Sequence, residues 1–191
     1  MFISPQTAID NGWIWRSSGA EITAAYIQPN AIDFTIDRAF AATGTIDFKA
    51  VDTIVDGELK TIKQFPKFSE LQATEDPDPM FDRVPMFAVP RQSSIDFLSD
   101  FYVDLPEGVA ALLIVRSTFN RGGNFVTSGL YDSGFQGNIG AALHNNGSST
   151  AWVGKGTRVG QIIFVQSDSV GSYAGGYNLV AGEVAAQHGP H

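Results

Sequence analysis

The chain has 191 residues, a formal net charge of −8 and 43% hydrophobic residues. This length and composition fit one domain with a sizeable buried core. The chain contains no cysteine, which excludes disulfides, thiol nucleophiles, iron–sulfur clusters and cysteine-ligated zinc. With only three histidines, it also has few ligands for a zinc enzyme.

The charges are unevenly divided along the chain. Residues 1–107 hold seventeen acids against eight Lys and Arg, whereas residues 108–191 hold three acids against four. A duplex nucleic-acid surface needs a basic stripe, so we expect no nucleic-acid partner. The acid-poor part would tolerate a polyanion, but on this observation alone a buried β core with few charges is the better explanation. Because the sequence has no signal-like start and no run of eighteen apolar residues, we expect no membrane partner and a cytoplasmic location.

In chain order, the first predicted element is a short helix. Ser4 is a typical cap, Pro5 suits the first helical position, and Gly12 follows residues 6–11 as a terminator. Almost all later elements are short runs of branched and aromatic residues separated by Gly, Pro, Asn and Asp, a pattern of strands. These runs are Ala31–Ile36, Met86–Val89, Phe101–Leu105, Val109–Val115, Asn138–Leu143 and Arg158–Val165. Many short strands predict a mostly β barrel or jelly roll.

Residues 47–83 interrupt this pattern with lysines, an acid–proline run at 74–79 and weak periodicity. We expect a surface excursion that contains a hairpin and a loop, not a second domain.

A tight hairpin is predicted around Asp132, within residues 129–139. Glycines that suit positive φ or close ligand approach stand at Gly129, Gly134 and Gly137. Tyr131 and Phe135 add packing bulk. Such a hairpin would hold one carboxylate rigidly at a pocket mouth, although an Asp before Ser-Gly also commonly caps its own turn.

Arg116 and Ser117 follow the apolar strand 109–115. A guanidinium fork and a neighbouring hydroxyl match phosphate oxygens, while the alternative is a structural ion pair. Arg121 either adds to such a phosphate clamp or holds the fold or a subunit contact. Gln161 could donate to a phosphate or satisfy main-chain groups in the core.

Four segments occur in the order found in the trimeric dUTPase and dCTP deaminase superfamily, which the chain resembles. They are residues 27–33 (Ile-Gln-Pro-Asn-Ala-Ile-Asp), residues 106–108 with 116–122 (Arg-Ser-Thr-Phe-Asn-Arg-Gly), the Asp132 hairpin and residues 156–164. The opening helix, Ile-Gln-Pro and the second arginine are similar to the deaminase branch, and residues 137–145 are similar to the dUTPase branch. The resemblance implies a distorted jelly-roll β-barrel over residues 1–165, a tail over 166–191, and a homotrimer with active sites between subunits.

The resemblance also implies roles for single residues. Asp132 would be the general base for water attacking the α-phosphate, with Mg²⁺ held chiefly by the phosphates. Asp33 would orient metal-bound water, or else stabilise a turn. The substrate contacts would come from Arg116, Ser117, Thr118, Arg121, Gly129, Phe135 and Gln161, with Phe135 packing on the deoxyribose. In the family, main-chain groups of the hairpin strands pair with uracil, and Tyr131 replaces the aliphatic residue usual before the aspartate.

Ala142 occupies the position where deaminases of this superfamily carry the glutamate that activates water against cytosine. A methyl group cannot move protons, and neither neighbouring position restores an acid. We therefore expect a dUTP diphosphatase that converts dUTP to dUMP and pyrophosphate. The alternatives are a dCTP deaminase or dCTP-hydrolysing relative, and a non-catalytic regulatory homologue that binds nucleotides.

The tail departs most from the family. It has no Lys or Arg after Arg158, but it carries Tyr173 and Tyr177 among glycines. Either tyrosine could stack on the base as part of a lid, and the alternative is a mobile tail with scattered aromatics.

Overall fold

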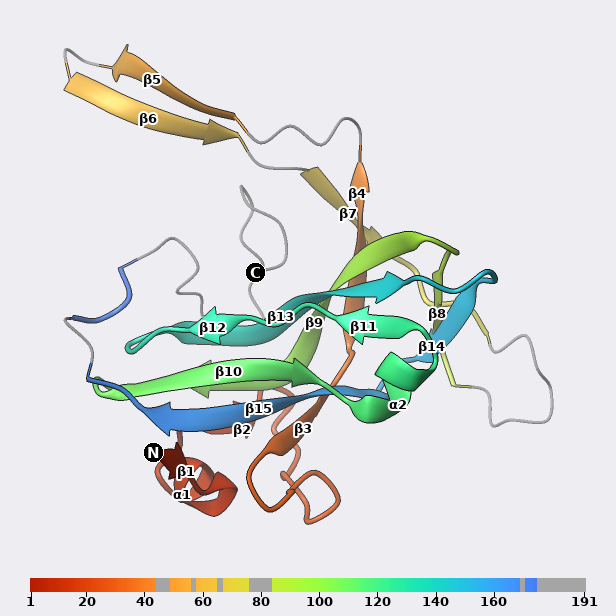
Figure 1. Cartoon of the computed structure of the whole chain (residues 1–191), viewed down its shortest axis with the longest axis horizontal. Helices are drawn as coiled ribbons and strands as arrows, with labels where there is room; N and C mark the ends of the chain where they lie inside the picture. Colours follow the sequence, from red (N-terminus) through yellow and green to blue (C-terminus); the bar gives the residue numbers. More distant parts are fainter. Residues whose placement is uncertain (44–48, 56–57, 65–66, 76–83, 169–170, 175–191) are drawn as a thin grey trace.

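The computed structural model describes residues 1–43, 49–55, 58–64, 67–75, 84–168 and 171–174 (Figure 1). Strands dominate, and two short helices accompany them, α1 (Pro5–Asp10) and α2 (Ser117–Arg121). The strands are β1 (Phe2–Ile3), β2 (Ile14–Arg16), β3 (Ile32–Thr35), β4 (Arg38–Thr43), β5 (Lys49–Val55), β6 (Glu58–Gln64), β7 (Lys67–Leu71), β8 (Met86–Val89), β9 (Ser93–Asp104), β10 (Val109–Val115), β11 (Asn124–Val126), β12 (Leu130–Tyr131), β13 (Gln136–Asn145), β14 (Ala151–Gly154) and β15 (Arg158–Gln166).

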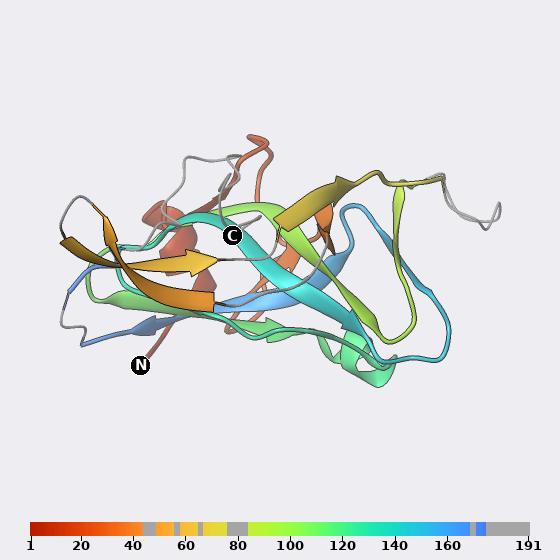
Figure 2. The ribbon, with the colours of Figure 1, turned by 90° about the horizontal axis from the view of Figure 1, so that it is seen from above.

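Two antiparallel sheets form the body of the protein. One has the order β1-β15-β10-β12, with β3 also paired to β15, and the other has the order β11-β13-β9-β4-β7, with β2 paired to β9. Seen from above in Figure 2, β13 of one sheet passes over β15 of the other. This layered arrangement confirms the predicted mostly β fold of jelly-roll type, although among the described residues the ladders do not close into one barrel.

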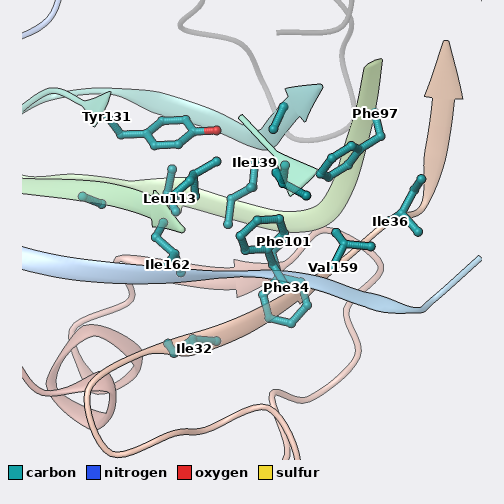
Figure 3. Close-up of a cluster of buried hydrophobic side chains, with 14 of the residues drawn as sticks. Ile32, Phe34, Ile36, Phe97, Phe101, Leu113, Tyr131, Ile139, Val159 and Ile162 are labelled. Atoms are coloured by element: carbon teal, nitrogen blue, oxygen red, sulfur yellow. The ribbon is translucent and has the colours of Figure 1, made fainter. Parts of the chain in front are cut away.

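The core lies between these sheets and consists of aromatic and branched side chains from both (Figure 3). Phe34 and Ile162 come from the first sheet, and Phe97, Phe101 and Ile139 come from the second; all are buried. Burial of such side chains contributes about 1.5–3 kcal/mol each, so the core fixes how the two sheets face each other.

Helix α1 forms as predicted. The Ser4 hydroxyl accepts a hydrogen bond from the Thr7 amide at 3.1 Å, Pro5 is the first helical residue, and Gly12 has a φ of +69°. Helix α2 was not predicted, because its five residues are too few to show a helical period.

Strands β8 and β10 have the predicted bounds, and the other predicted runs lie within or overlap observed strands. The predicted run Phe101–Leu105 forms the end of the much longer β9. Within residues 47–83, β5 and β6 pair as an antiparallel hairpin, which Figure 1 shows beyond the ends of β4 and β7. The division into a domain over 1–165 and a tail over 166–191 stays a prediction.

No helix in the described part of the chain is long and apolar enough to cross a membrane.

Candidate active site

The hairpin between β12 and β13 is held mainly by its backbone. The Phe135 amide donates to the Asp132 carbonyl at 3.1 Å, which closes a four-residue turn with Gly134 at φ +78°. Two further hydrogen bonds join the turn to the end of β9, from the Leu105 amide to the Phe135 carbonyl and from the Gly134 amide to the Leu105 carbonyl. Of the three glycines expected to need unusual backbone, Gly134 is the one with positive φ.

The buried hydroxyl of Ser133 anchors the same turn from beneath. It accepts from the Gly108 amide at 3.0 Å and donates to the Val109 carbonyl at 3.1 Å. The adjacent Asp132 side chain is exposed, and no side chain or amide of the described residues pairs with its carboxylate. Its carboxylate does not cap the turn, so it remains available for chemistry.

Asp132 lies at a cavity of about 200 Å³ between the two hairpin strands and the start of the tail. Its lining residues are Gly129, Leu130, Tyr131, Asp132, Phe135, Asn138, Gly140 and Tyr173. Four residues predicted for the site therefore come together here: Gly129, Asp132, Phe135 and Tyr173. We call this cavity the Asp132 pocket.

Aromatic rings form the inner wall of the Asp132 pocket. Phe135 is 7% exposed and packs edge-on against Tyr131, with ring centroids 4.7 Å apart, and against Tyr173, at 5.4 Å. The Tyr173 amide donates to the Ser133 carbonyl at 2.6 Å, so the tail lies on the hairpin here. A Cβ at Gly134 would come within 2.7 Å of the Ser172 Cβ, which leaves room for glycine alone. Tyr177 lies outside the described residues.

Tyr131 makes an unusual pair of hydrogen bonds within the pocket wall. Its hydroxyl donates to the Gly140 carbonyl and accepts from the Gly140 amide, both at 3.0 Å. Burial raises the pKa of the Tyr131 hydroxyl, so the group stays protonated and can make both bonds. The sequence indicated only that Tyr131 adds bulk and replaces an aliphatic residue, because the partner of its hydroxyl depends on the pairing of β13.

A second group of predicted residues surrounds Asp33, which is fully buried on β3. Its carboxylate lies 3.5 Å from the Arg116 Nε and 3.4 Å from an Arg158 Nη, and it accepts from the Gln161 amide at 2.9 Å. We call these four residues the Asp33 cluster. The expectation that Asp33 orients metal-bound water stays a prediction; the observed geometry makes it the residue around which two guanidinium groups and an amide are arranged.

Arg158 was not among the predicted site residues. The signal was present in the sequence, because Arg158 belongs to the same matched segment as Gln161 and is one of few cations in the acid-poor half. The Arg116 and Arg158 side chains are 29% and 37% exposed. A guanidinium has five N–H donors, so each arginine retains donors that can bind a polyanion.

Glycine is required immediately before Gln161. A Cβ on Gly160 would come within 2.2 Å of the Phe34 ring, which packs against β15 at this point. The β3–β15 register also shifts between Arg158 and Gly160. This close packing brings Asp33 and Gln161 opposite each other on paired strands.

Helix α2 starts directly after Arg116. Ser117 and Thr118 form its exposed first turn, and Arg121 lies exposed in its last turn without a partner among the described residues. Ser117, Thr118 and Arg121 therefore follow Arg116 of the Asp33 cluster closely in the sequence. Their hydroxyl and guanidinium groups are exposed to solvent.

Within one chain, the Asp132 pocket and the Asp33 cluster are separate. Tyr131 pairs with Ala111 on β10, and Arg116 lies five residues farther along, which corresponds to about 17 Å at the rise of an antiparallel strand. The structure thus brings the predicted site residues into two groups, with the acid in one and the cations in the other.

Ala142 lies on β13, where its amide donates to the Thr127 hydroxyl at 3.0 Å. The residue paired with it across the sheet is Asp96 on β9. Asp96 therefore shares a face of the sheet with Ala142, which sequence spacing could not reveal. Asp96 is not part of the lining of the Asp132 pocket.

A family model described as dCTP deaminase-like matches residues 100–167, which include the Asp132 hairpin, Arg116 and Gln161. A probable deoxyuridine 5′-triphosphate nucleotidohydrolase of Methanopyrus kandleri is 27% identical over 86% of this chain and 96% of its own length. A dCTP deaminase of Sulfurisphaera tokodaii is 30% identical over 64% of this chain and 67% of its own length.

Among solved structures, the dCTP deaminase of Agrobacterium tumefaciens superposes with a TM-score of 0.60 at 12% identity. The match covers 87% of this chain and 48% of that protein, so the chain spans about half of it. This likeness concerns the fold alone. The sequence relatives and the family model lead to one conclusion: the chain belongs to the superfamily of dUTPases and dCTP deaminases.

Proposed function

We propose that the protein is a dUTP diphosphatase that hydrolyses dUTP to dUMP and pyrophosphate. The observation that carries this proposal is the Asp132 carboxylate, which is exposed and without a partner among the described residues at the mouth of an aromatic-walled pocket, on a backbone-held hairpin. The absence of an acid at Ala142 on the strand of the same hairpin favours hydrolysis over deamination.

In the proposed reaction, Asp132 accepts a proton from a water molecule as the water oxygen bonds to the α-phosphorus. The bond from that phosphorus to the oxygen bridging to the β-phosphate breaks, and pyrophosphate leaves with the bonding electrons. A positioned base of this kind typically contributes about 10²–10⁴-fold to the rate. Phe135 would pack on the deoxyribose, and Tyr173 would cover the base from the tail.

The triphosphate would bind to the Asp33 cluster and the first turn of α2. Arg116 and Arg158 present guanidinium donors, Gln161 presents an amide, and Ser117 and Thr118 present hydroxyls. Asp33 would hold the two arginines and Gln161 in place. A carboxylate fully enclosed by these groups fits a positioning role.

Mg²⁺ is the proposed cofactor. In the described part of the chain, no three His, Asp or Glu side chains gather into a metal site, so the phosphates would have to supply most of the ligands. The ion would neutralise phosphate charge and fix the curvature of the triphosphate when bound.

A complete site would need two copies of the chain. A water on Asp132 must lie beside the α-phosphorus, yet the Arg116 end of β10 is about 17 Å away along the strand in the same chain. The Arg116 guanidinium also points to Asp33 and not to the pocket, whereas a neighbouring subunit could bring its own Asp33 cluster to the pocket. This geometry supports a homotrimer with sites between subunits.

The deaminase alternative has one observation in its favour, the carboxylate of Asp96 opposite Ala142. Since Asp96 is not part of the pocket lining, we rank this alternative second. The assay described next distinguishes the enzyme from the third candidate, a regulatory homologue that binds nucleotides without catalysis.

The test is to incubate the purified protein with Mg²⁺ and dUTP, dCTP or dTTP in turn, and to resolve nucleotide products and pyrophosphate. We expect dUMP and pyrophosphate from dUTP. Formation of dUTP from dCTP would overturn the argument from Ala142, and an Asp96→Asn variant would then show whether Asp96 replaces the missing acid. Tight dUTP binding without any product would instead support the regulatory homologue.

A further inference from the structure

Tyr131 holds the two main-chain polar groups of Gly140 in the wall of the Asp132 pocket. Its hydroxyl bonds to the amide and to the carbonyl of the same residue, each at 3.0 Å. Both residues line the cavity that Asp132 also lines. A main-chain donor and acceptor side by side in a pocket wall are the groups with which a flat heterocycle can pair.

Gly140 needs this hydroxyl because strand pairing is interrupted on one edge of β13. On the edge away from β9, β11 pairs with β13 only over Leu143–Asn145. Strand β12 pairs with β10 instead. Among the described residues, no strand therefore pairs with β13 at Gly140 on that edge, and the Tyr131 hydroxyl takes the place of a strand.

The same edge of Gly140 is complementary to a pyrimidine. An N–H beside a C=O matches an acceptor beside a donor, such as O4 and N3–H of uracil. A base that pairs there must displace the Tyr131 hydroxyl. The cavity of about 200 Å³ is also smaller than the roughly 300–1,000 Å³ common for small-molecule sites, so a base fits there only if a lining side chain moves.

We propose that Tyr131 is a gate that determines the specificity of this pocket: its hydroxyl occupies the amide and carbonyl of Gly140 until a pyrimidine base displaces it. This inference rests on the proposed function, because it requires a nucleotide base in the Asp132 pocket. The gate lowers the affinity of every ligand whose base must displace the hydroxyl, and it does so least for a base that replaces both hydrogen bonds. A pyrimidine that replaces both is selected over a ligand that replaces one or neither.

The test compares Tyr131→Phe with a matched control, Ser99→Ala. The Ser99 hydroxyl is also buried and accepts a hydrogen bond from the main-chain amide of Phe101 at 3.2 Å, but Ser99 is not part of the pocket lining. Affinities for dUMP and deoxyribose 5-phosphate are measured by titration calorimetry on the full chain. Melting temperatures are measured with and without dUMP.

The gate predicts that Tyr131→Phe lowers the melting temperature of the free protein, because Gly140 loses its partners, yet binds dUMP about tenfold more tightly. Deoxyribose 5-phosphate, which has no base, should bind both proteins equally. Ser99→Ala should lower the melting temperature, because the Phe101 amide loses its partner, without changing either affinity. A purely structural Tyr131 would make Tyr131→Phe behave like Ser99→Ala, and that result would overturn the proposal.

A second measurement on the unaltered protein covers the case in which Tyr131→Phe does not fold. The amide resonance of Gly140 is followed by NMR while dUMP is added. Displacement of the hydroxyl predicts a dUMP-dependent shift that deoxyribose 5-phosphate does not produce; an unmoved resonance at saturating dUMP would overturn the gate. If dUMP and a non-hydrolysable dUTP analogue bind to none of the proteins, the proposed function itself fails.

Discussion

The Asp132 pocket and the Asp33 cluster are built around the same kind of residue in opposite surroundings. Asp132 is exposed and has no partner among the described residues, and main-chain hydrogen bonds hold the turn that carries it. Asp33 is fully buried and is surrounded by Arg116, Arg158 and Gln161. The difference teaches that an unpaired carboxylate on a rigid turn can take up a proton, whereas an enclosed one organises its neighbours.

Replacing Asp132 should have the largest effect on activity. Asp132→Asn keeps the size of the side chain but removes the base, so we expect dUTP hydrolysis to fall by about 10³-fold while dUTP still binds. Because the carboxylate is exposed and unpaired, the free energy of unfolding should change by no more than about 0.5 kcal/mol. Steady-state kinetics, calorimetric titration and denaturant unfolding provide the three readouts. An unchanged kcat in Asp132→Asn would contradict the proposal that Asp132 is the general base.

Replacing Asp33 should have its direct effect on stability, in contrast to the effect of Asp132 on activity. Asp33→Asn keeps an acceptor for Gln161 but removes the charge between two arginines, and breaking a buried ion pair from one side costs about 3 kcal/mol of unfolding free energy. Denaturant unfolding measures this loss. If Asp33→Asn proved as stable as the unaltered chain, the proposed difference between the two aspartates would be wrong.

Arg158→Gln should weaken binding of the triphosphate in particular. Loss of one charge-assisted contact predicts about tenfold weaker binding of a non-hydrolysable dUTP analogue, with little change for dUMP. Arg91→Gln is the matched control, since Arg91 is exposed shortly before β9 and belongs to neither group of predicted site residues. An equal loss in both variants would indicate general charge attraction and not a built phosphate site.

The smallest expected effect is that of Tyr173. Removing its ring from Phe135 in Tyr173→Ala should weaken dUMP binding roughly threefold, in line with about 0.5–1.5 kcal/mol for an aromatic pair. Tyr173→Phe keeps the ring and should bind as the unaltered protein does. If both variants bind dUMP equally well, the tail does not contribute to base binding.

The sequence predicted those parts of the fold whose signals are local. Helix α1 carries its own cap and stop residues, Ser4 and Gly12, and β8 and β10 are bounded by turn residues. Helix α2 offered no such signal, because it is only five residues long. The candidate catalytic acid and the candidate phosphate-binding arginine were also identifiable, because the motif that contains each of them is contiguous.

Contacts between distant segments were not predictable in this way. The Asp33 cluster depends on β3 pairing with β15, so Asp33 and Gln161 meet across 128 residues of sequence. The bond from Tyr131 to Gly140 depends on where β11 stops pairing with β13. The separation of the acid from the cations follows from the register of β12 on β10, which no sequence pattern specifies.

The most direct test of this account is subunit complementation. Asp132→Asn and Arg116→Gln chains, each inactive alone, are co-expressed with different tags, and the mixed oligomers are purified and assayed for dUMP formation from dUTP. If one subunit supplies Asp132 and its neighbour supplies Arg116, each mixed trimer contains one intact site of three, so the purified mixed trimers should show about a third of the unaltered activity. Mixed oligomers that stay inactive would contradict a site shared between two copies of the chain.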